Sequence, residues 1–321
     1  MLPLYPEIKP YARHTVDVGS NHQLYVDESG TPDGIPVLFV HAGPGSGCEY
    51  DSRCFFNPEK YRIILFDQRG AGRSTPHASV TDNTTQHLIA DMEQIREFLG
   101  IEQWMLFGGG FGSMLSLAYA QAQPDNVLAM VMRGVFLGRQ ADIDWIYQDG
   151  ASRFFPDHWE DFVSPIADAD QGNLVAAYQH RIDGADELAR MAAIKSWSRW
   201  EADCSTMHPN VRLIKHFTDP VRATARSKIA LHYFNNQCFL EDNQILSAVD
   251  TIQDIPGIIV QGRYDMVCPL INAFELHEAW PVSQLFIIRE AGHSATEPVL
   301  IDALIRATRD MALRFEADFG V

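Results

Sequence analysis

The chain has 321 residues, 46% of them hydrophobic and 21% charged, which supplies a large core and excludes a disordered or fibrous protein. Its 25 lysines and arginines against 42 aspartates and glutamates give a net charge of −17. This negative field repels nucleic-acid phosphates and anionic membrane surfaces. We therefore expect a small-molecule or short-peptide substrate, and neither nucleic acid nor membrane as a partner.

The first 132 residues alternate between strand and helix patterns. Residues 14–18 and 23–27 alternate around a Gly-Ser-Asn turn, which predicts a hairpin. Short apolar runs are typical of strands buried on both faces of a parallel sheet, and they occupy residues 37–40, 63–66, 104–107 and 127–132. Between them, helical spacing of apolar residues predicts helices over 83–99 and 111–122.

The pattern changes in residues 138–239, which hold four tryptophans and many helix formers but no convincing strand. Strand and helix then alternate again, with strands over 257–261 and 284–288 and a final helix over 297–315. This order predicts an α/β protein with a doubly wound, mostly parallel sheet. We expect its core to comprise residues 1–137 and 240–321, and residues 138–239 to form an inserted helical cap.

The cysteines and the first residues exclude several other classes. Five cysteines without C-x-x-C spacing argue against a disulfide framework and a thiolate zinc site, and no H-x-x-x-H pattern occurs, so no metal is expected. A reactive cysteine needs a base and an electropositive setting, and Cys268 is the best placed of the five. The first residues lack a basic start followed by an apolar run, so a cytoplasmic protein is expected.

Glycine-rich or polar segments follow the predicted strands. They read His-Ala-Gly-Pro-Gly at 41–45, Asp-Gln-Arg-Gly-Ala-Gly-Arg-Ser at 67–74, Phe-Gly-Gly-Gly-Phe-Gly-Ser at 107–113, Gly-Arg-Tyr-Asp at 262–265 and Gly-His-Ser at 292–294. The third segment is similar to the strand-to-helix turn G-x-S-x-G, which presents a nucleophilic serine at the top of a sheet. Gly110 occupies the serine position and offers no oxygen. A dinucleotide fingerprint over 108–113 lacks the third glycine and the later acidic residue, so no cofactor is expected.

Taken in order, these segments resemble the prolyl aminopeptidases (proline iminopeptidases) of the α/β-hydrolase superfamily. The family motifs H-G-G-P-G, D-Q-R-G-x-G-x-S, G-G-S-W-G-S, G-R-Y-D and G-H all have counterparts. Segments 133–136, 147–153 and 197–201 in or near the predicted cap also match. The resemblance implies an α/β-hydrolase fold with a cap domain.

The resemblance also implies roles for the matching residues. Asp265 would orient His293, and His293 would act as general base and acid. Backbone N–H groups near Gly43 and Phe111 would form the oxyanion hole, while His41 would support its loop. The alternative interpretation of Asp265 and His293 is a loop carboxylate and a helix-cap histidine.

Two departures from the family pattern bear on activity. Gly110 stands where the family has its nucleophilic serine. Ala230 stands where the family has a glutamate that, with the counterpart of Glu201, binds the free α-amino group of the substrate. We expect acyl-enzyme peptidase activity to be lost. The expected substrate-binding positions are Arg133, Phe136, Tyr147, Glu201, Ala230 and Phe234.

Three functional hypotheses remain open. The chain is an altered hydrolase whose parent reaction was release of an N-terminal proline or a related amide or ester hydrolysis. Alternatively, it is a serine-free enzyme in which His293 and Asp265 act as a general base for cyclisation, elimination or direct hydrolysis. The third hypothesis is a binding protein that retains the pocket without turnover.

Overall fold

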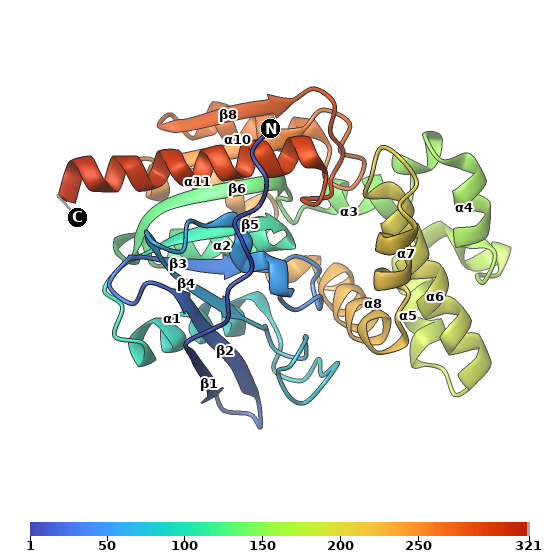
Figure 1. The fold of residues 1–321 in the computed structure, drawn as a ribbon. Helices are drawn as coiled ribbons and strands as arrows, with labels where there is room; N and C mark the ends of the chain where they lie inside the picture. Colours follow the sequence, from blue (N-terminus) through green and yellow to red (C-terminus); the bar gives the residue numbers. More distant parts are fainter. Residues whose placement is uncertain (320–321) are drawn as a thin grey trace.

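A single eight-stranded sheet forms the centre of the molecule in the computed structural model, which describes residues 1–319. The strands lie in the order β1-β2-β4-β3-β5-β6-β7-β8, and Figure 1 shows β8 at the top of the sheet and β1 and β2 at the bottom. β1 pairs antiparallel with β2, and β2 with β4, while all other neighbours are parallel. The strands are β1 (Ala12–Asp17), β2 (Gln23–Gly30), β3 (Ile35–Val40), β4 (Tyr61–Phe66), β5 (Trp104–Gly110), β6 (Val127–Val135), β7 (Gly257–Gly262) and β8 (Ser283–Ile288).

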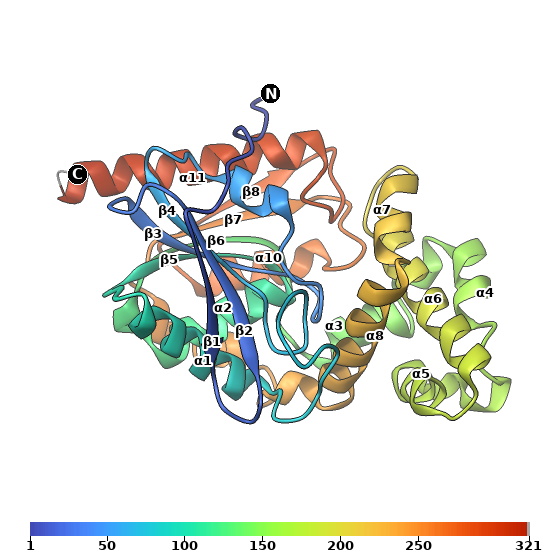
Figure 2. The same cartoon turned by 60° about the horizontal axis from the view of Figure 1, so that its bottom comes forward.

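Two apolar clusters cover the two faces of the sheet. Because side chains alternate along a strand, neighbours such as Val37 and Leu38 in β3 belong to different clusters. One face packs against α1 (Thr85–Phe98), α2 (Phe111–Ala122) and α10 (Leu270–Ala279), and the other against α11 (Pro298–Phe319). Figures 1 and 2 show α11 on the opposite side of the sheet from α1 and α2. This two-layered burial explains why the central strands are almost continuously apolar.

The segment between β6 and β7 is helical. Its helices gather at one end of the sheet, on the right in Figures 1 and 2. Stacked aromatic rings hold them together, for example Phe162 on Tyr178 with centroids 4.9 Å apart and Tyr147 on Trp197 at 4.2 Å. The helices are α3 (Gln140–Tyr147), α4 (Pro156–Val163), α5 (Leu174–Asp183), α6 (Glu187–Cys204), α7 (Val211–Phe217) and α8 (Pro220–Asn235), and the short α9 (Gln244–Ser247) precedes β7.

The α/β fold class predicted from the sequence is confirmed, as are the hairpin, the six strand runs, both early helices and the final helix. All six helices α3–α8 fall within residues 138–239, while the division into core and cap domains stays a prediction. Helix α10 was not predicted. Its Ile271 and Phe274 are exposed at 54% and 45%, and these large apolar side chains on the solvent face obscure the helical period. Among the described helices, none is both long and apolar enough to span a membrane.

Candidate active site

A sharp turn between β5 and α2 presents Gly110 at the end of the sheet. Its backbone has φ 55° and ψ −127°, a region that glycine enters at little cost and that strains other residues. The side chain of Ser113 fixes this turn, because its Oγ donates to the carbonyl of Gly110 at 2.7 Å and accepts from the amide of Phe136 at 3.1 Å. The turn is thus held by groups other than a side chain at position 110.

A carboxylate and an imidazole from two later loops meet beside this turn. Nδ1 of His293 lies 2.8 Å from Oδ2 of Asp265, which is buried just after β7. Oδ1 of Asp265 accepts from the amides of Val267 and Cys268 at 3.0 and 2.7 Å, and Oδ2 accepts from Nε2 of Gln261 at 3.2 Å. With this carboxylate as an acceptor, Nδ1 of His293 donates.

The partly buried guanidinium of Arg133 lies against the same imidazole. Its Nη1 donates to the carbonyl of His293 at 2.9 Å and lies 3.4 Å from Nε2. Burial lowers the pKa of Arg133. The contact with the Asp265 carboxylate places a proton on Nδ1, and a guanidinium that donates but does not accept is compatible with a lone pair on Nε2. His293 therefore has the tautomer of a general base.

Gly134 lets the backbone of β6 approach the two catalytic candidates closely. Its φ is +49°, and a Cβ there would lie 2.9 Å from Cε1 and Nδ1 of His293 and 3.2 Å from Oδ2 of Asp265. It sits at an irregularity in the pairing with β5, where Gly109 pairs with Arg133 and Gly110 with Val135. Sequence reasoning missed Gly134 and Gln261 as site residues, although Gly134 lay within a segment that matched the family.

The imidazole faces the turn. A Cβ at Gly110 would lie 3.6 Å from both Cε1 and Nε2 of His293 and 3.7 Å from Cβ of Ala42. These are ordinary van der Waals distances, so the space beside Nε2 accepts at least one further heavy atom. Gly110, His293 and Asp265 are therefore brought together, and their catalytic roles stay a prediction.

Two residues whose backbone amides suit an oxyanion line the same cavity. Phe111 is the first residue of α2, and amides in the first turn of a helix lack intrahelical acceptors and lie at the positive end of the helix dipole. Gly43 follows β3 with φ +130° and lines the cavity together with Phe111. The oxyanion hole itself stays a prediction.

His41 is the first residue after β3 and belongs to the loop that contains Gly43. Its Nδ1 lies 2.8 Å from the carbonyl of Ala42, and the amide of Gln68 donates to its Nε2 at 3.0 Å. Burial lowers the pKa of His41, so the neutral imidazole joins two loops. This arrangement agrees with the supporting role expected from the sequence.

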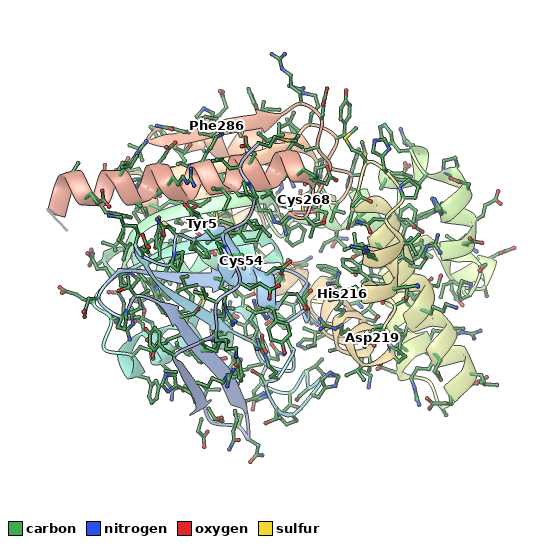
Figure 3. All side chains as sticks on the ribbon, viewed as in Figure 1. Tyr5, Cys54, His216, Asp219, Cys268 and Phe286 are labelled. Atoms are coloured by element: carbon green, nitrogen blue, oxygen red, sulfur yellow. The ribbon has the colours of Figure 1, made fainter. Side chains whose placement is uncertain are left out.

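A cavity of about 780 Å³ separates the end of the sheet from the helices of residues 138–239. Figure 3 labels two of its lining residues, Cys268 on the side of the sheet and His216 on the side of these helices. Asp265 lies behind His293, and Ala230, which is 1% exposed in α8, does not line the cavity. The other predicted site residues all line it: Gly43, Gly110, Phe111, Arg133, Phe136, Tyr147, Glu201, Phe234 and His293.

Glu201 in α6 has partners on both carboxylate oxygens. The hydroxyl of Tyr147 donates to Oε1 at 2.7 Å, and Nη2 of Arg226 in α8 donates to Oε2 at 2.8 Å. Burial and the neighbouring Glu201 raise the pKa of Tyr147 well above its usual value, which keeps the hydroxyl protonated. Arg226 was missed from the sequence because a single arginine on a helix is typically exposed.

Cys268 is a poor candidate for a nucleophile. The residue is 2% exposed, and burial raises the pKa of its thiol well above the usual value. A thiol is a poor nucleophile compared with a thiolate. Within residues 1–319, no cluster of three or more His, Cys, Asp or Glu side chains is arranged to hold a metal ion.

The fold and the site together define an α/β-hydrolase. Residues 35–297 match the family described as alpha/beta hydrolase fold. A solved esterase from Rhodococcus sp. aligns with a TM-score of 0.62 at 16% identity, covering 94% of this chain and 98% of its own. A putative lipase from Acinetobacter baumannii aligns with a TM-score of 0.66 at 14% identity, covering 96% and 92%. At these identities the solved structures show the fold.

Similar proteins identify a narrower family within the α/β-hydrolases. A proline iminopeptidase from Xylella fastidiosa is 48% identical over 309 residues, covering 96% of this chain and 99% of the relative. A proline iminopeptidase from Arabidopsis thaliana is 45% identical over 310 residues, covering 96% and 82%. The chain belongs to the proline iminopeptidase family, as the motifs predicted.

Proposed function

We propose that this chain is a proline-iminopeptidase-like enzyme that works without a serine nucleophile. In this proposal His293 acts as a general base on a water molecule, or on an acidic proton of the substrate, held above Gly110. The amides of Gly43 and Phe111 would stabilise the resulting oxyanion. The observation that carries the proposal is the oriented Nε2 of His293, which lies 3.6 Å from the Cβ position of a residue that has no side chain.

Neither Ser113 nor Cys268 replaces the missing oxygen. The resemblance to the family puts the nucleophilic serine at position 110, where glycine has no acyl-accepting atom. The nearby hydroxyl of Ser113 is buried and bonded to the carbonyl of Gly110 and the amide of Phe136. Cys268 is a thiol with a raised pKa. An acyl-enzyme at the elbow is therefore not expected.

Direct hydrolysis is the simplest reaction for this arrangement. His293 takes a proton from water, the hydroxide adds to the substrate carbonyl, and the protonated imidazole then returns the proton to the leaving group. If the proton comes instead from the substrate, the same base starts a cyclisation or an elimination. Both routes use the hydrogen bond to Asp265, which stabilises the imidazolium.

The test compares aryl-ester and proline-arylamide hydrolysis by the native chain, His293→Ala and Gly110→Ser. We expect the native chain to exceed His293→Ala by about 10²-fold or more on an activated aryl ester, without a burst or a covalent adduct in the mass spectrum. Gly110→Ser is expected to introduce the burst. If the native chain only equals His293→Ala while Gly110→Ser turns over, the chain is a disabled hydrolase and the proposal fails.

A further inference from the structure

The end of the cavity formed by Glu201 already contains a cation from the protein itself. Glu201 is 7% exposed, and its two carboxylate oxygens accept from Tyr147 and from Arg226 at 2.7 and 2.8 Å. Both Glu201 and Arg226 line the cavity. A ligand ammonium that approached Glu201 would therefore have to displace a guanidinium or share the carboxylate with it.

Arg226 is held on several sides. Its Nη1 donates to Oγ of Ser46, in the loop after β3, and its guanidinium carbon lies 4.0 Å from the ring centroid of Phe217 in α7. The side chain is 13% exposed, and its Nε is buried without a partner among the described residues. Moving this guanidinium away would break the ion pair and leave Glu201 as an uncompensated buried charge, which is strongly unfavourable.

The same end of the cavity has no second carboxylate from α8. Ala230 lies four residues after Arg226, on the same face of the helix, and its methyl group is buried. Another charged residue of the lining, Glu49, is itself paired with Arg222 and His216. One carboxylate and one guanidinium make the Glu201 end electrically neutral.

Aromatic side chains make up the adjoining wall. Phe136 and Phe234 form an edge-to-face pair with centroids 6.0 Å apart, and Tyr147 packs against Phe234 at 5.4 Å. All three line the cavity. An apolar wall beside an internally neutralised ion pair stabilises uncharged groups and not isolated charges.

We propose that Arg226 takes the place of a substrate ammonium at Glu201, so that the cavity selects carbonyl compounds that are uncharged at this end and rejects free α-amino groups. The preferred substrates carry an acylated amine, or no amine, next to the reacting carbonyl. Arg226 is then a specificity-determining residue. The inference rests on the proposed function, because it names the substrate class of the same cavity.

Calorimetric binding of two small probes tests the proposal without requiring turnover. Proline amide and N-acetylproline amide differ in charge, because the free amine is largely protonated at pH 6.5. We expect the native chain to bind N-acetylproline amide at least about tenfold more tightly than proline amide. Arg226→Met removes the cation but keeps an apolar stem, and we expect it to reverse the preference.

Arg222→Met is the matched control, one turn earlier on α8. Arg222 pairs with Glu49 and lies outside the Glu201 contact, so the ratio of the two affinities should stay unchanged in this variant. Arg226→Gln, which loses the charge but keeps a hydrogen-bond donor, is the second variant if Arg226→Met does not fold. It should shift the ratio in the same direction.

Three outcomes overturn the inference: tighter or equal binding of proline amide by the native chain, an unchanged ratio in the folded Arg226 variant, or no binding of N-acetylproline amide. Failure of the proposed function would give a different experimental result. In that case ester turnover would be insensitive to His293→Ala while the binding preference for the acetylated probe persisted.

Discussion

At Gly110 the backbone keeps a conformation that suits a nucleophile, although the residue carries no side chain. The φ of +55° strains any residue with a Cβ, but the Cβ itself would meet its nearest neighbours at 3.6 Å. Backbone strain and not steric overlap therefore opposes a side chain here. Restoring a hydroxyl at this position is possible at a cost in stability.

The first prediction concerns this cost. We expect Gly110→Ser and Gly110→Ala to lower the free energy of unfolding by about 1–3 kcal/mol, measured by urea denaturation. Gly100→Ala is the control, because Gly100 has φ +62° and no atom within 4 Å of its Cβ position. A loss at position 110 well above about 3 kcal/mol would exceed backbone strain and show that overlap contributes, contrary to the distances.

Position 134 requires glycine for a different reason. The absence of a Cβ leaves room for the imidazole of His293. In Gly134→Ala the methyl group would lie 2.9 Å from two ring atoms of His293 and would displace the ring from Gly110. A displacement of about 1 Å in a reacting group can cost on the order of 10² in rate. We expect a fall of that size in His293-dependent ester turnover, measured as kcat.

Gly138→Ala is the control for Gly134→Ala. Gly138 also has a positive φ, +75°, but its Cβ would meet the flexible side chain of Met114 at 2.8 Å. This variant should lose stability and keep its kcat. Equal kcat values for the two folded variants would contradict the positioning role of Gly134.

At the scale of elements, glycine sets how closely α2 approaches the sheet. A Cβ at Gly112 would lie 2.1 Å from the carbonyl oxygen of Val40 in β3, and one at Gly108 would lie 2.3 Å from the carbonyl oxygen of Gly112. These contacts are with backbone atoms, which no rotamer change relieves. The glycines of the turn therefore fix the position of the first residue of α2 and its amide.

The Gly112→Ala variant tests this packing. Helix propensity alone would favour alanine by about 1 kcal/mol, whereas overpacking against a rigid strand costs about 1–3 kcal/mol or more. The overlap at 2.1 Å decides the sign, so we expect net destabilisation in urea denaturation. A stabilised variant would mean that α2 moves freely away from β3.

Strand runs and their order were predictable from the sequence because buried parallel strands are locally apolar, as in residues 37–40 and 104–107. His293 and Asp265 were named as candidates because each lies in a short motif that resembles a motif of the family. Gln261 and Arg226 were not found, because their roles depend on contacts between distant segments. Gln261 accepts from the amide of Val135, and Arg226 donates to Glu201 and Ser46. Such contacts leave no local pattern in the amino-acid sequence.

At the scale of the whole molecule, charged contacts connect helices α7 and α8 to the loops after β3. Glu49, which precedes a short 3-10 helix at Tyr50–Phe55, pairs with Arg222 in α8 and with His216 in α7. Arg226 reaches Ser46 in the same loop. These contacts lie beside the cavity that holds the candidate active site. They therefore help to hold helices α7 and α8 against the loop after β3.

Glu49 makes this connection dependent on pH. Burial alone would raise the pKa of Glu49, but hydrogen bonds from His216 and Arg222 outweigh burial and lower the pKa to about 2, from 4.5 for an unperturbed glutamate. A carboxylate with a lowered pKa in the folded state stabilises the fold above its unfolded pKa. That contribution is lost as the pH falls from about 4.5 through about 2.

We expect Glu49→Gln to be less stable than the native chain at pH 6 and the difference to shrink towards zero as the pH is lowered to about 2. Subtracting the two urea midpoints at each pH removes the contributions of the other carboxylates, which both proteins share. The side chain of Glu49 is 34% exposed, so added salt should also reduce the difference at pH 6 through screening. A difference that stays constant between pH 6 and pH 2 would show that the variant acts through packing and not through the charge of Glu49.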